Sequence, residues 1–502
     1  MSESISSPLK RLLGGSAFIL LGNIIGLGAT FVTRLVAARH LGPSDYGLLI
    51  LGITLLNILV LVSLLGLHQG LARELPRESV PTAAFYGAVI IAVPLSVAVT
   101  VLALSVTAEV GNVLADPSFY PIYRLFVLAL PFVVFTRLVV GTARGCENTT
   151  GRVLVWNICK QGLVAGVVVL SAFLGWSVNQ VTQAWIGALV FTAIIAGLFV
   201  IAYTDVDPLR MELLTTAKGT VLPRASSLVV FSLPLMLSGT MRLTMQQADN
   251  FLIGAFLLSS DVGVYDSTYT LGRLLFIVTA TVGYLFLPIF SDLHAEGERD
   301  RMDRFYKMTA KWMAFLVVPA YLLLVLHPEF VLSTVFGAGY EVGATSLRLV
   351  ATGFLFHVIF GITGNGLIAI GNTRSMAVGN GLALLLNLGM NVLLIPRYGI
   401  TGAAIASAFS YALVNTYWLY RLYEQTGVQP FYRAYIQPIA SGAVLLLTLD
   451  AIVWRAVETP LLATLGFVAI GAILYPTTFY LAGGIESEDR ELLTVVRNRI
   501  GV

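Results

Sequence analysis

Charged residues are scarce in this sequence. Asp, Glu, Lys and Arg together make up 11% of its 502 residues, whereas a typical soluble domain contains about 25%. Hydrophobic residues reach 57%, and the mean hydropathy is +0.86. So few charges could not cover the surface of a soluble protein of this length, and the composition therefore predicts an integral membrane protein. The formal net charge of only +3 argues against a nucleic-acid partner.

The sequence also lacks the motifs of disulfide frameworks, metal sites and nucleotide-driven pumps. Its two cysteines, Cys146 and Cys159, form no CxxC pair, and we interpret them as small buried residues. No Gly-x-x-x-x-Gly-Lys-Ser/Thr loop is present, which argues against ATP hydrolysis by this chain. No connecting loop is long enough to form a catalytic domain. We therefore expect a protein that is not an enzyme and that has no cofactor and no metal.

Long apolar runs, in contrast, are abundant. A helix that crosses about 30 Å of hydrocarbon needs about 20 mostly apolar residues, and fourteen segments meet this requirement. The sequence therefore predicts an all-α integral membrane protein with about 14 transmembrane helices. The predicted spans are 12–38, 46–67, 83–106, 121–143, 155–175, 183–203, 227–257, 263–290, 311–333, 345–369, 375–396, 400–422, 433–454 and 460–482.

The distribution of Lys and Arg predicts the orientation of these spans. With the N-terminus inside, 21 of the 30 Lys and Arg residues lie on inner loops and flanks, 5 on the outer side and 4 within the membrane. An excess of Lys and Arg is typical of cytoplasmic loops. We therefore predict a multi-pass protein of the cell membrane with both termini in the cytoplasm.

The chain contains an internal repeat. The segment that begins at Arg34 aligns without a gap with the segment that begins at Asn250, so that Asp45-Tyr46-Gly47 matches Asp261-Val262-Gly263. Six predicted spans separate the two copies, which gives both copies the same orientation in the membrane. This predicts two six-helix lobes related by a pseudo-two-fold axis along the membrane normal. The predicted divisions are an N-lobe at 1–226, a C-lobe at 227–425, and two further helices with a cytoplasmic tail at 426–502.

Four stretches carry a resemblance to a known family. They are Ala38–Gly47, Leu287–Ser291 with the charged segment Asp292–Lys307 behind it, Val335–Tyr340, and Leu393–Ala406. In this order, on a fourteen-span frame, the chain resembles the polysaccharide flippases of the Wzx type, within the multidrug/oligosaccharidyl-lipid/polysaccharide exporter superfamily.

The resemblance implies a transporter that moves a lipid-linked sugar from the cytoplasmic to the outer leaflet by alternating access. The sugar hangs from a polyprenyl or dolichyl phosphate or pyrophosphate. The implied partners are this lipid-linked glycan and membrane lipids, with glycan-assembly enzymes as candidate protein partners. We expect the chain to act as a monomer.

Charged side chains at membrane depth are the candidate binding residues. An unpaired Arg at the bilayer centre costs roughly 2.5–3.5 kcal/mol on insertion scales, so it usually faces a partner or a cavity. A guanidinium suits a phosphate because its planar fork donates several hydrogen bonds and stays charged. We therefore expect a cationic cavity lined by Arg34, Arg137, Arg242, Arg273, Gln246 and Asn250.

Less specific interpretations of these arginines stay open. Arg34 and Arg137 could extend to the nearest membrane surface, and Arg242 and Arg273 could form structural salt bridges. Asp249 is the carboxylate that we place well inside the first twelve spans. It could be the partner of such an arginine or a site of ion coupling.

An ion-coupled multidrug or cation exporter of the same superfamily is the alternative function. A cation exporter needs an acidic cavity, whereas the first predicted span carries Arg34 and no Asp or Glu. An anionic cargo therefore agrees better with the charges at membrane depth. Fourteen spans also fit flippases better, since drug exporters of the superfamily often have twelve.

Overall fold

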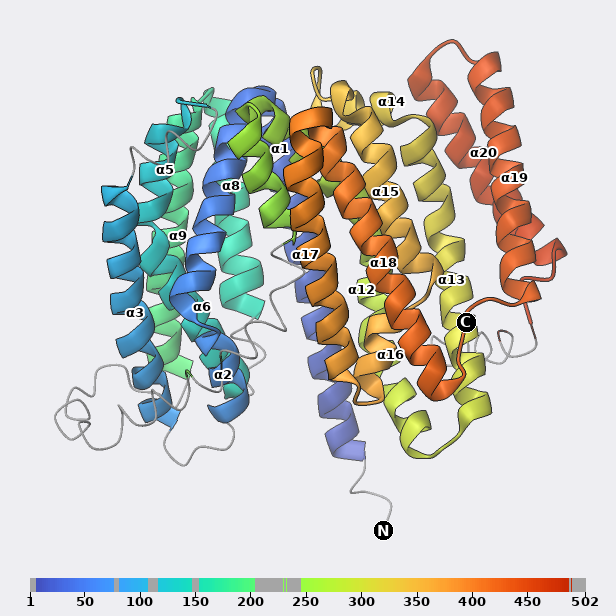
Figure 1. The fold of residues 1–502 in the computed structure, drawn as a ribbon, viewed down its shortest axis with the longest axis horizontal. Helices are drawn as coiled ribbons and strands as arrows, with labels where there is room; N and C mark the ends of the chain where they lie inside the picture. The colour runs from blue at the N-terminus through green and yellow to red at the C-terminus, as the bar shows by residue number, and fades with distance from the viewer. Residues whose placement is uncertain are drawn as a thin grey trace. The chain divides into compact units, whose positions relative to one another are not determined.

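The computed structural model describes residues 6–75, 81–106, 116–146, 153–203, 229, 232, 245–486 and 489, and within these residues every regular element is a helix (Figure 1). The helices before residue 204 are α1 (Ser6–Leu64), α2 (Leu67–Glu74), α3 (Pro81–Ser105), α5 (Phe119–Leu128), α6 (Leu130–Gly145), the π-helix η2 (Val153–Lys160), α8 (Gln161–Leu174) and α9 (Val178–Tyr203). Residues 245–256 are helical. The later elements are α12 (Ser259–Ala295), α13 (Arg299–Leu326), α14 (Pro328–Phe336), the short 3-10 helix η4 (Glu341–Gly343), α15 (Ala344–Ile359), α16 (Thr363–Ala369), α17 (Thr373–Tyr398), α18 (Ile400–Thr426), α19 (Arg433–Ala456) and α20 (Pro460–Leu481).

The prediction of an all-helical, multi-pass membrane protein is confirmed. In the part of the chain that the structure describes, eight helices are long and apolar enough to cross a membrane, or ten if each of two bent pairs counts as one span. The total of fourteen stays a prediction, because most of the predicted span 227–257 lies outside the described residues.

The chain divides into two compact units. Unit 1 consists of Met1–Ser267, Val335–Gly339 and Asn391–Ile400, and unit 2 consists of Thr268–Thr334, Tyr340–Met390 and Thr401–Val502. The arrangement of two six-helix lobes, with boundaries at 226 and 425, stays a prediction.

The first helix of unit 1 is broken at Gly42. Its apolar part, Ile25–Leu64, has 40 residues and would be about 60 Å long if straight, twice the thickness of the hydrocarbon. Gly42 has φ 74° and ψ 173°, and Pro43 follows it. A left-handed φ is easily reached only by glycine, and proline cannot donate the next helical hydrogen bond. The break therefore divides α1 into two arms, and the predicted spans 12–38 and 46–67 lie on either side of it.

The two repeat copies pack against each other through their glycines in unit 1. A Cβ atom placed on Gly47 would lie 1.7 Å from the carbonyl oxygen of Ser259, and a Cβ atom on Gly263 would lie 2.2 Å from the carbonyl oxygen of Pro43. In the gapless alignment Gly47 matches Gly263 and Pro43 matches Ser259. The two contacts are therefore reciprocal, since each copy presents a glycine to the same carbonyl position of the other.

In unit 2, α19 and α20 form an antiparallel hairpin (Figure 1) that packs on α13. The apolar contact is reinforced by Lys311 of α13, whose side chain is fully buried. Its Nζ lies 2.5 Å from Asp489 and 2.8 Å from Glu486, both of which follow α20. A buried ammonium needs such partners because its desolvation is otherwise uncompensated. Glu486 and Asp489, which follow α20 in the sequence, therefore link the end of the hairpin to α13.

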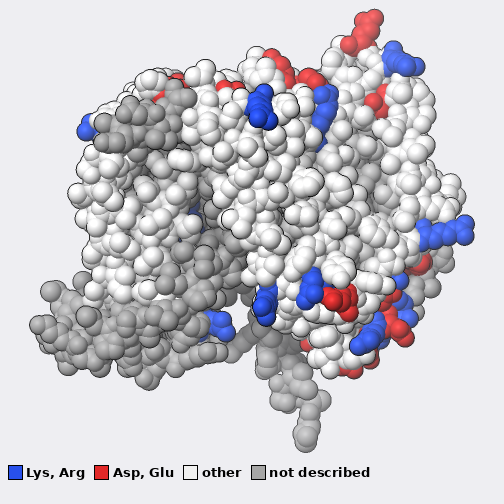
Figure 2. All heavy atoms as spheres, in the orientation of Figure 1, with Lys and Arg blue, Asp and Glu red and all other residues white. Residues whose placement is uncertain are grey.

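The surface has the character of a protein embedded in lipid. On the face shown in Figure 2, charged side chains gather toward the ends of the helices, and the surface between these ends is almost uncharged. On α20, the exposed side chains include Leu461, Leu465, Ile473 and Leu481. Exposed leucine and isoleucine side chains of this kind are expected where lipid replaces water as the surrounding medium.

The reciprocal glycine contact should not tolerate a side chain. In Gly47→Ala, the added methyl group would overlap a backbone carbonyl. We therefore expect this substitution to lower the free energy of unfolding by about 1–3 kcal/mol, the usual cost of overpacking, or by more. Gly166→Ala in α8 is the matched control, since a Cβ there meets nothing within 4 Å. Thermal unfolding of the purified protein in detergent measures both. Equal midpoints for the two variants would contradict the close backbone contact.

Candidate functional site

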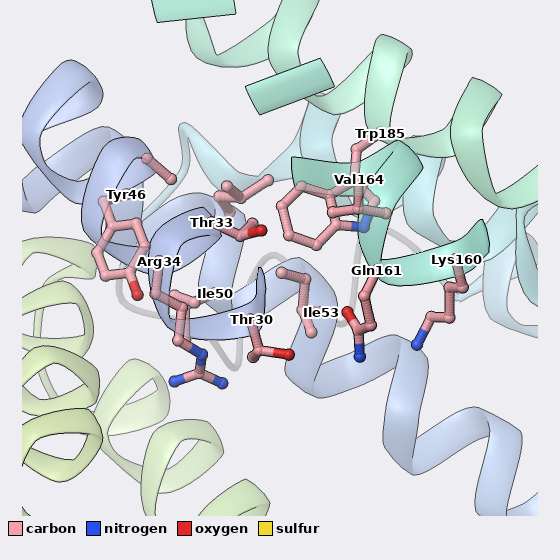
Figure 3. Close-up of a pocket in the computed structure, with 12 residues that line it drawn as sticks. Thr30, Thr33, Arg34, Tyr46, Ile50, Ile53, Lys160, Gln161, Val164 and Trp185 are labelled. Atoms are coloured by element: carbon pink, nitrogen blue, oxygen red, sulfur yellow. The ribbon is translucent and has the colours of Figure 1, made fainter. Parts of the chain in front are cut away.

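Unit 1 contains a cavity of about 140 Å³ (Figure 3). Both arms of α1, the junction of η2 with α8, and α9 form its walls. Among the described residues, the polar groups of its lining are two cations, several hydroxyl groups, one amide and the indole of Trp185, and none is a carboxylate. The lining residues are Thr30, Thr33, Arg34, Ala37, Tyr46, Leu49, Ile50, Ile53, Lys160, Gln161, Val164 and Trp185.

The break in α1 brings both of its arms to this cavity. Before the break, Thr30, Thr33, Arg34 and Ala37 recur at helical spacing and share one face. After it, Tyr46, Leu49, Ile50 and Ile53 do the same on the second arm. Figure 3 shows the polar ends of Arg34, Thr30, Gln161 and Lys160 along one edge of the cavity, with Trp185 toward the opposite edge.

Arg34 is held by a carboxylate that lies beside the cavity. One of its terminal guanidinium nitrogens, Nη1, lies 2.7 Å from Oδ1 and 2.6 Å from Oδ2 of Asp266. Asp266 is fully buried, whereas the Arg34 side chain is 21% exposed. Asp266 also accepts a hydrogen bond of 2.7 Å from the Tyr46 hydroxyl and one of 3.3 Å from Nδ2 of Asn250. A buried ion pair with additional donors of this kind is costly to break from one side only.

Lys160 belongs to a second group of cations in unit 1. Its Nζ lies 3.9 Å from the centre of a ring of Trp156, and the guanidinium carbon of Arg137 lies 4.4 Å from the same ring. The Nε atom of Arg137 is buried without a hydrogen-bond partner. Within the described residues, no carboxylate forms an ion pair with Arg137 or Lys160. Cation–π contacts stabilise the charged forms of these two side chains and bring no anion to them.

Asp249 has other contacts. It is fully buried, and it accepts hydrogen bonds of 2.7 Å from the Tyr265 hydroxyl and 2.6 Å from Nδ2 of Asn391. Arg34 pairs with Asp266, which lies near the start of the predicted span 263–290. Whether Asp249 pairs with another arginine or couples an ion stays a prediction.

The remaining expected residues are spread over several places. Asn250 is buried and contacts Asp266, and Gln246 is buried on the same helical segment, but neither is among the lining residues of the cavity. Arg273 is an exposed residue of α12 in unit 2, and Arg242 lies outside the described residues. The cavity therefore includes Arg34 from the expected set, together with Lys160, which the sequence had placed at the inner flank of a span.

Residues 36–344 match the family described as "Polysaccharide biosynthesis protein". The "Probable low-salt glycan biosynthesis flippase Agl15" of Haloferax volcanii is 24% identical over 406 residues, which is 81% of this chain and 82% of the relative.

Two solved structures show the fold. The lipid II flippase MurJ in an inward closed conformation superposes with a TM-score of 0.67 at 12% identity, over 93% of this chain and 99% of the other. An inward-facing multidrug resistance MATE family transporter of the MOP superfamily gives a TM-score of 0.62 at 14% identity, over 80% and 94%. At these identities the likeness shows the fold alone.

The pair of Arg34 and Asp266 should behave as one unit in stability measurements. Arg34→Gln should lower the free energy of unfolding by up to about 3–5 kcal/mol, because it leaves the fully buried Asp266 carboxylate without its cation. Asp266→Asn should cost less, because the Arg34 side chain is partly exposed. The double variant should be more stable than the sum of the two losses predicts. Thermal unfolding of the wild type, the two single variants and the double variant completes this double-mutant cycle. Strictly additive losses would mean that the two side chains do not interact.

Proposed function

Because the chain belongs to the polysaccharide biosynthesis protein family, we propose that it is a flippase for a lipid-linked sugar. The family consists of membrane transporters and not of enzymes. In this proposal the sugar is carried on a polyprenyl or dolichyl phosphate or pyrophosphate. It moves from the cytoplasmic to the outer leaflet by alternating access.

The observation that carries the proposal is the charge of the cavity. Arg34 and Lys160 both line it, and none of the described residues that line it is acidic. A phosphate that leaves water needs compensating cations, since an isolated anion is poorly tolerated in an apolar interior. Arg34 would supply paired hydrogen bonds from its fork, and Lys160 would supply a compact charge.

The remaining walls suit the first sugar of such a substrate. Thr30, Thr33 and Gln161 offer hydroxyl and amide groups, and Trp185 offers an aromatic face. At about 140 Å³, the cavity is smaller than the 300–1,000 Å³ typical of sites for drug-sized ligands. It therefore fits the phosphate group and its immediate neighbours, while the isoprenoid tail stays in the lipid.

The same observation disfavours the cation exporter. A cationic drug would meet the side chains of Arg34 and Lys160 in this cavity and no carboxylate among the described lining residues. The Asp266 carboxylate beside the cavity is already engaged by Arg34. The fold is shared with a multidrug transporter, but fold does not determine cargo. The charged residues of the cavity therefore support an anionic substrate over a cationic one.

Transport in vesicles tests the proposal. We expect Lys160→Gln and Arg34→Lys each to reduce translocation of a labelled polyprenyl-phosphate sugar roughly 10-fold or more, because hydrogen bonds to charged groups contribute about 1.5–3 kcal/mol each. Arg34→Lys keeps a charge beside Asp266 but removes the fork. Arg301→Gln is the control, since Arg301 is an exposed residue of α13 that pairs with Glu298 of the preceding turn. Normal transport by both cavity variants would refute the assignment.

The proposed direction of transport requires the predicted orientation. Arg299 is the first residue of α13, whose 28 residues are about 42 Å long. Glu341 follows α14, the next helix after α13. In a protein with Cys146 and Cys159 replaced by serine, Arg299→Cys should be protected from a membrane-impermeant thiol reagent in intact cells. Glu341→Cys should react. The opposite pattern would reverse the proposed orientation.

A further inference from the structure

The guanidinium of Arg34 is shared between the cavity and a buried anion. Nη1 contacts both carboxylate oxygens of Asp266, and part of the side chain remains exposed on the cavity side. Asp266 itself is fully buried and is not among the lining residues. Any anion that enters the cavity therefore meets an arginine that is already engaged by an anion of the protein.

We propose that Asp266 is an internal competitor that gives up Arg34 when the substrate's phosphate binds and takes it back when the phosphate leaves. This inference rests on the proposed function, because it requires that the cavity bind an anion. Carboxylates and phosphates compete for a guanidinium on equal terms, since both are anionic and accept through oxygen. In this role Asp266 is a positioning residue that acts on the substrate through Arg34.

Two neutral donors keep the Asp266 carboxylate hydrogen-bonded when Arg34 turns to the phosphate. The Tyr46 hydroxyl bonds to Oδ2 at 2.7 Å, and Nδ2 of Asn250 bonds to Oδ1 at 3.3 Å. Each carboxylate oxygen thus keeps one donor after Arg34 has turned toward the cavity. Without them the displaced carboxylate would be a buried charge with no described partner, and the exchange would be prohibitively unfavourable.

The competition has a use in transport. A carrier has to bind its cargo on one side of the membrane and release it on the other, so its affinity must be limited. Arg34 with no competitor would hold a phosphate tightly and release it slowly. Asp266 lowers the affinity and restores the ion pair of the empty carrier as the phosphate departs.

A purely structural role for Asp266 makes a different prediction. If the ion pair only fixes Arg34 in place, then loss of Asp266 and loss of its supporting donor Asn250 should both weaken anion binding. Competition predicts that the two substitutions change the affinity for the anion in opposite directions. Removing Asp266 strengthens binding, whereas removing Asn250 weakens binding, because the displaced carboxylate then loses one of its two remaining donors.

The test is calorimetric titration of the purified full-length protein in detergent with inorganic phosphate and, separately, inorganic pyrophosphate. Relative to the wild type, Asp266→Asn should lower the Kd about tenfold, the scale of one charge-assisted hydrogen bond. Asn250→Ala should raise the Kd severalfold, and Arg34→Gln/Asp266→Asn should abolish binding. Asp450→Asn, the same substitution at a carboxylate of unit 2 that pairs with His327, should leave the Kd unchanged.

Transport provides the second readout. In vesicles, Asp266→Asn should lower the substrate concentration needed for half-maximal transport and also lower the maximal rate, because release becomes slower. If Asp266→Asn fails to fold, as judged by gel filtration and thermal unfolding, the milder Asn250→Ala variant decides the question by the sign of its change in Kd.

The outcomes separate the two proposals. The competition proposal is overturned if the wild type binds the anion through Arg34 but Asp266→Asn binds it equally well or more weakly. It is also overturned if Asn250→Ala binds the anion equally well or more tightly than the wild type. Either result leaves the proposed anion site intact. No binding of either anion by the wild type or by Asp266→Asn overturns both. Tighter binding by Asp266→Asn together with weaker binding by Asn250→Ala supports the competition.

Discussion

A carboxylate buried at membrane depth has to receive its hydrogen bonds from the protein, because hydrocarbon contains no water to supply them. Asp266 meets this requirement with donors from three places: Arg34 before the break in α1, Tyr46 after it, and Asn250 in the helical segment 245–256. The hydrogen bonds of this one carboxylate thus fix four backbone segments relative to one another. They are the two arms of α1, the helical segment 245–256, and α12, which carries Asp266 itself. The orientation of Arg34, and with it the polarity of the cavity, follows from that demand.

The backbone packing beside this network permits it. Gly47 lies one residue from Tyr46, and the lack of a side chain lets its helix approach the carbonyl of Ser259. The same approach occurs between Gly263 and Pro43. Since Gly263 precedes Asp266 by less than one helical turn, these contacts hold Asp266 at the distance at which Arg34 and Tyr46 reach it. Small residues are used in this way wherever membrane helices need to pack closely.

Much of this fold could be predicted from the sequence, because long apolar runs indicate helices that cross a membrane. The predicted spans 375–396, 433–454 and 460–482 lie within or nearly coincide with α17, α19 and α20. Arg34 could be identified as well, since a charge inside an apolar run stands out. Asp266 was missed because it lies near the predicted outer end of its span, and its partner is 232 residues away, a pairing that no local pattern reveals. Lys160 was assigned to a flank because it lies near the edge of an apolar run, and only the three-dimensional structure shows that it lines the cavity.

The reciprocal contact of Gly47 with Ser259 and of Gly263 with Pro43 also shows where the two aligned segments differ. An isologous interface between two identical subunits repeats every contact with the partners exchanged, and these two backbone contacts have that form. The side chains do not follow the same symmetry. The matching positions 34 and 250 carry Arg and Asn, and both bond to the single carboxylate of Asp266, whereas a symmetric arrangement would need two such carboxylates.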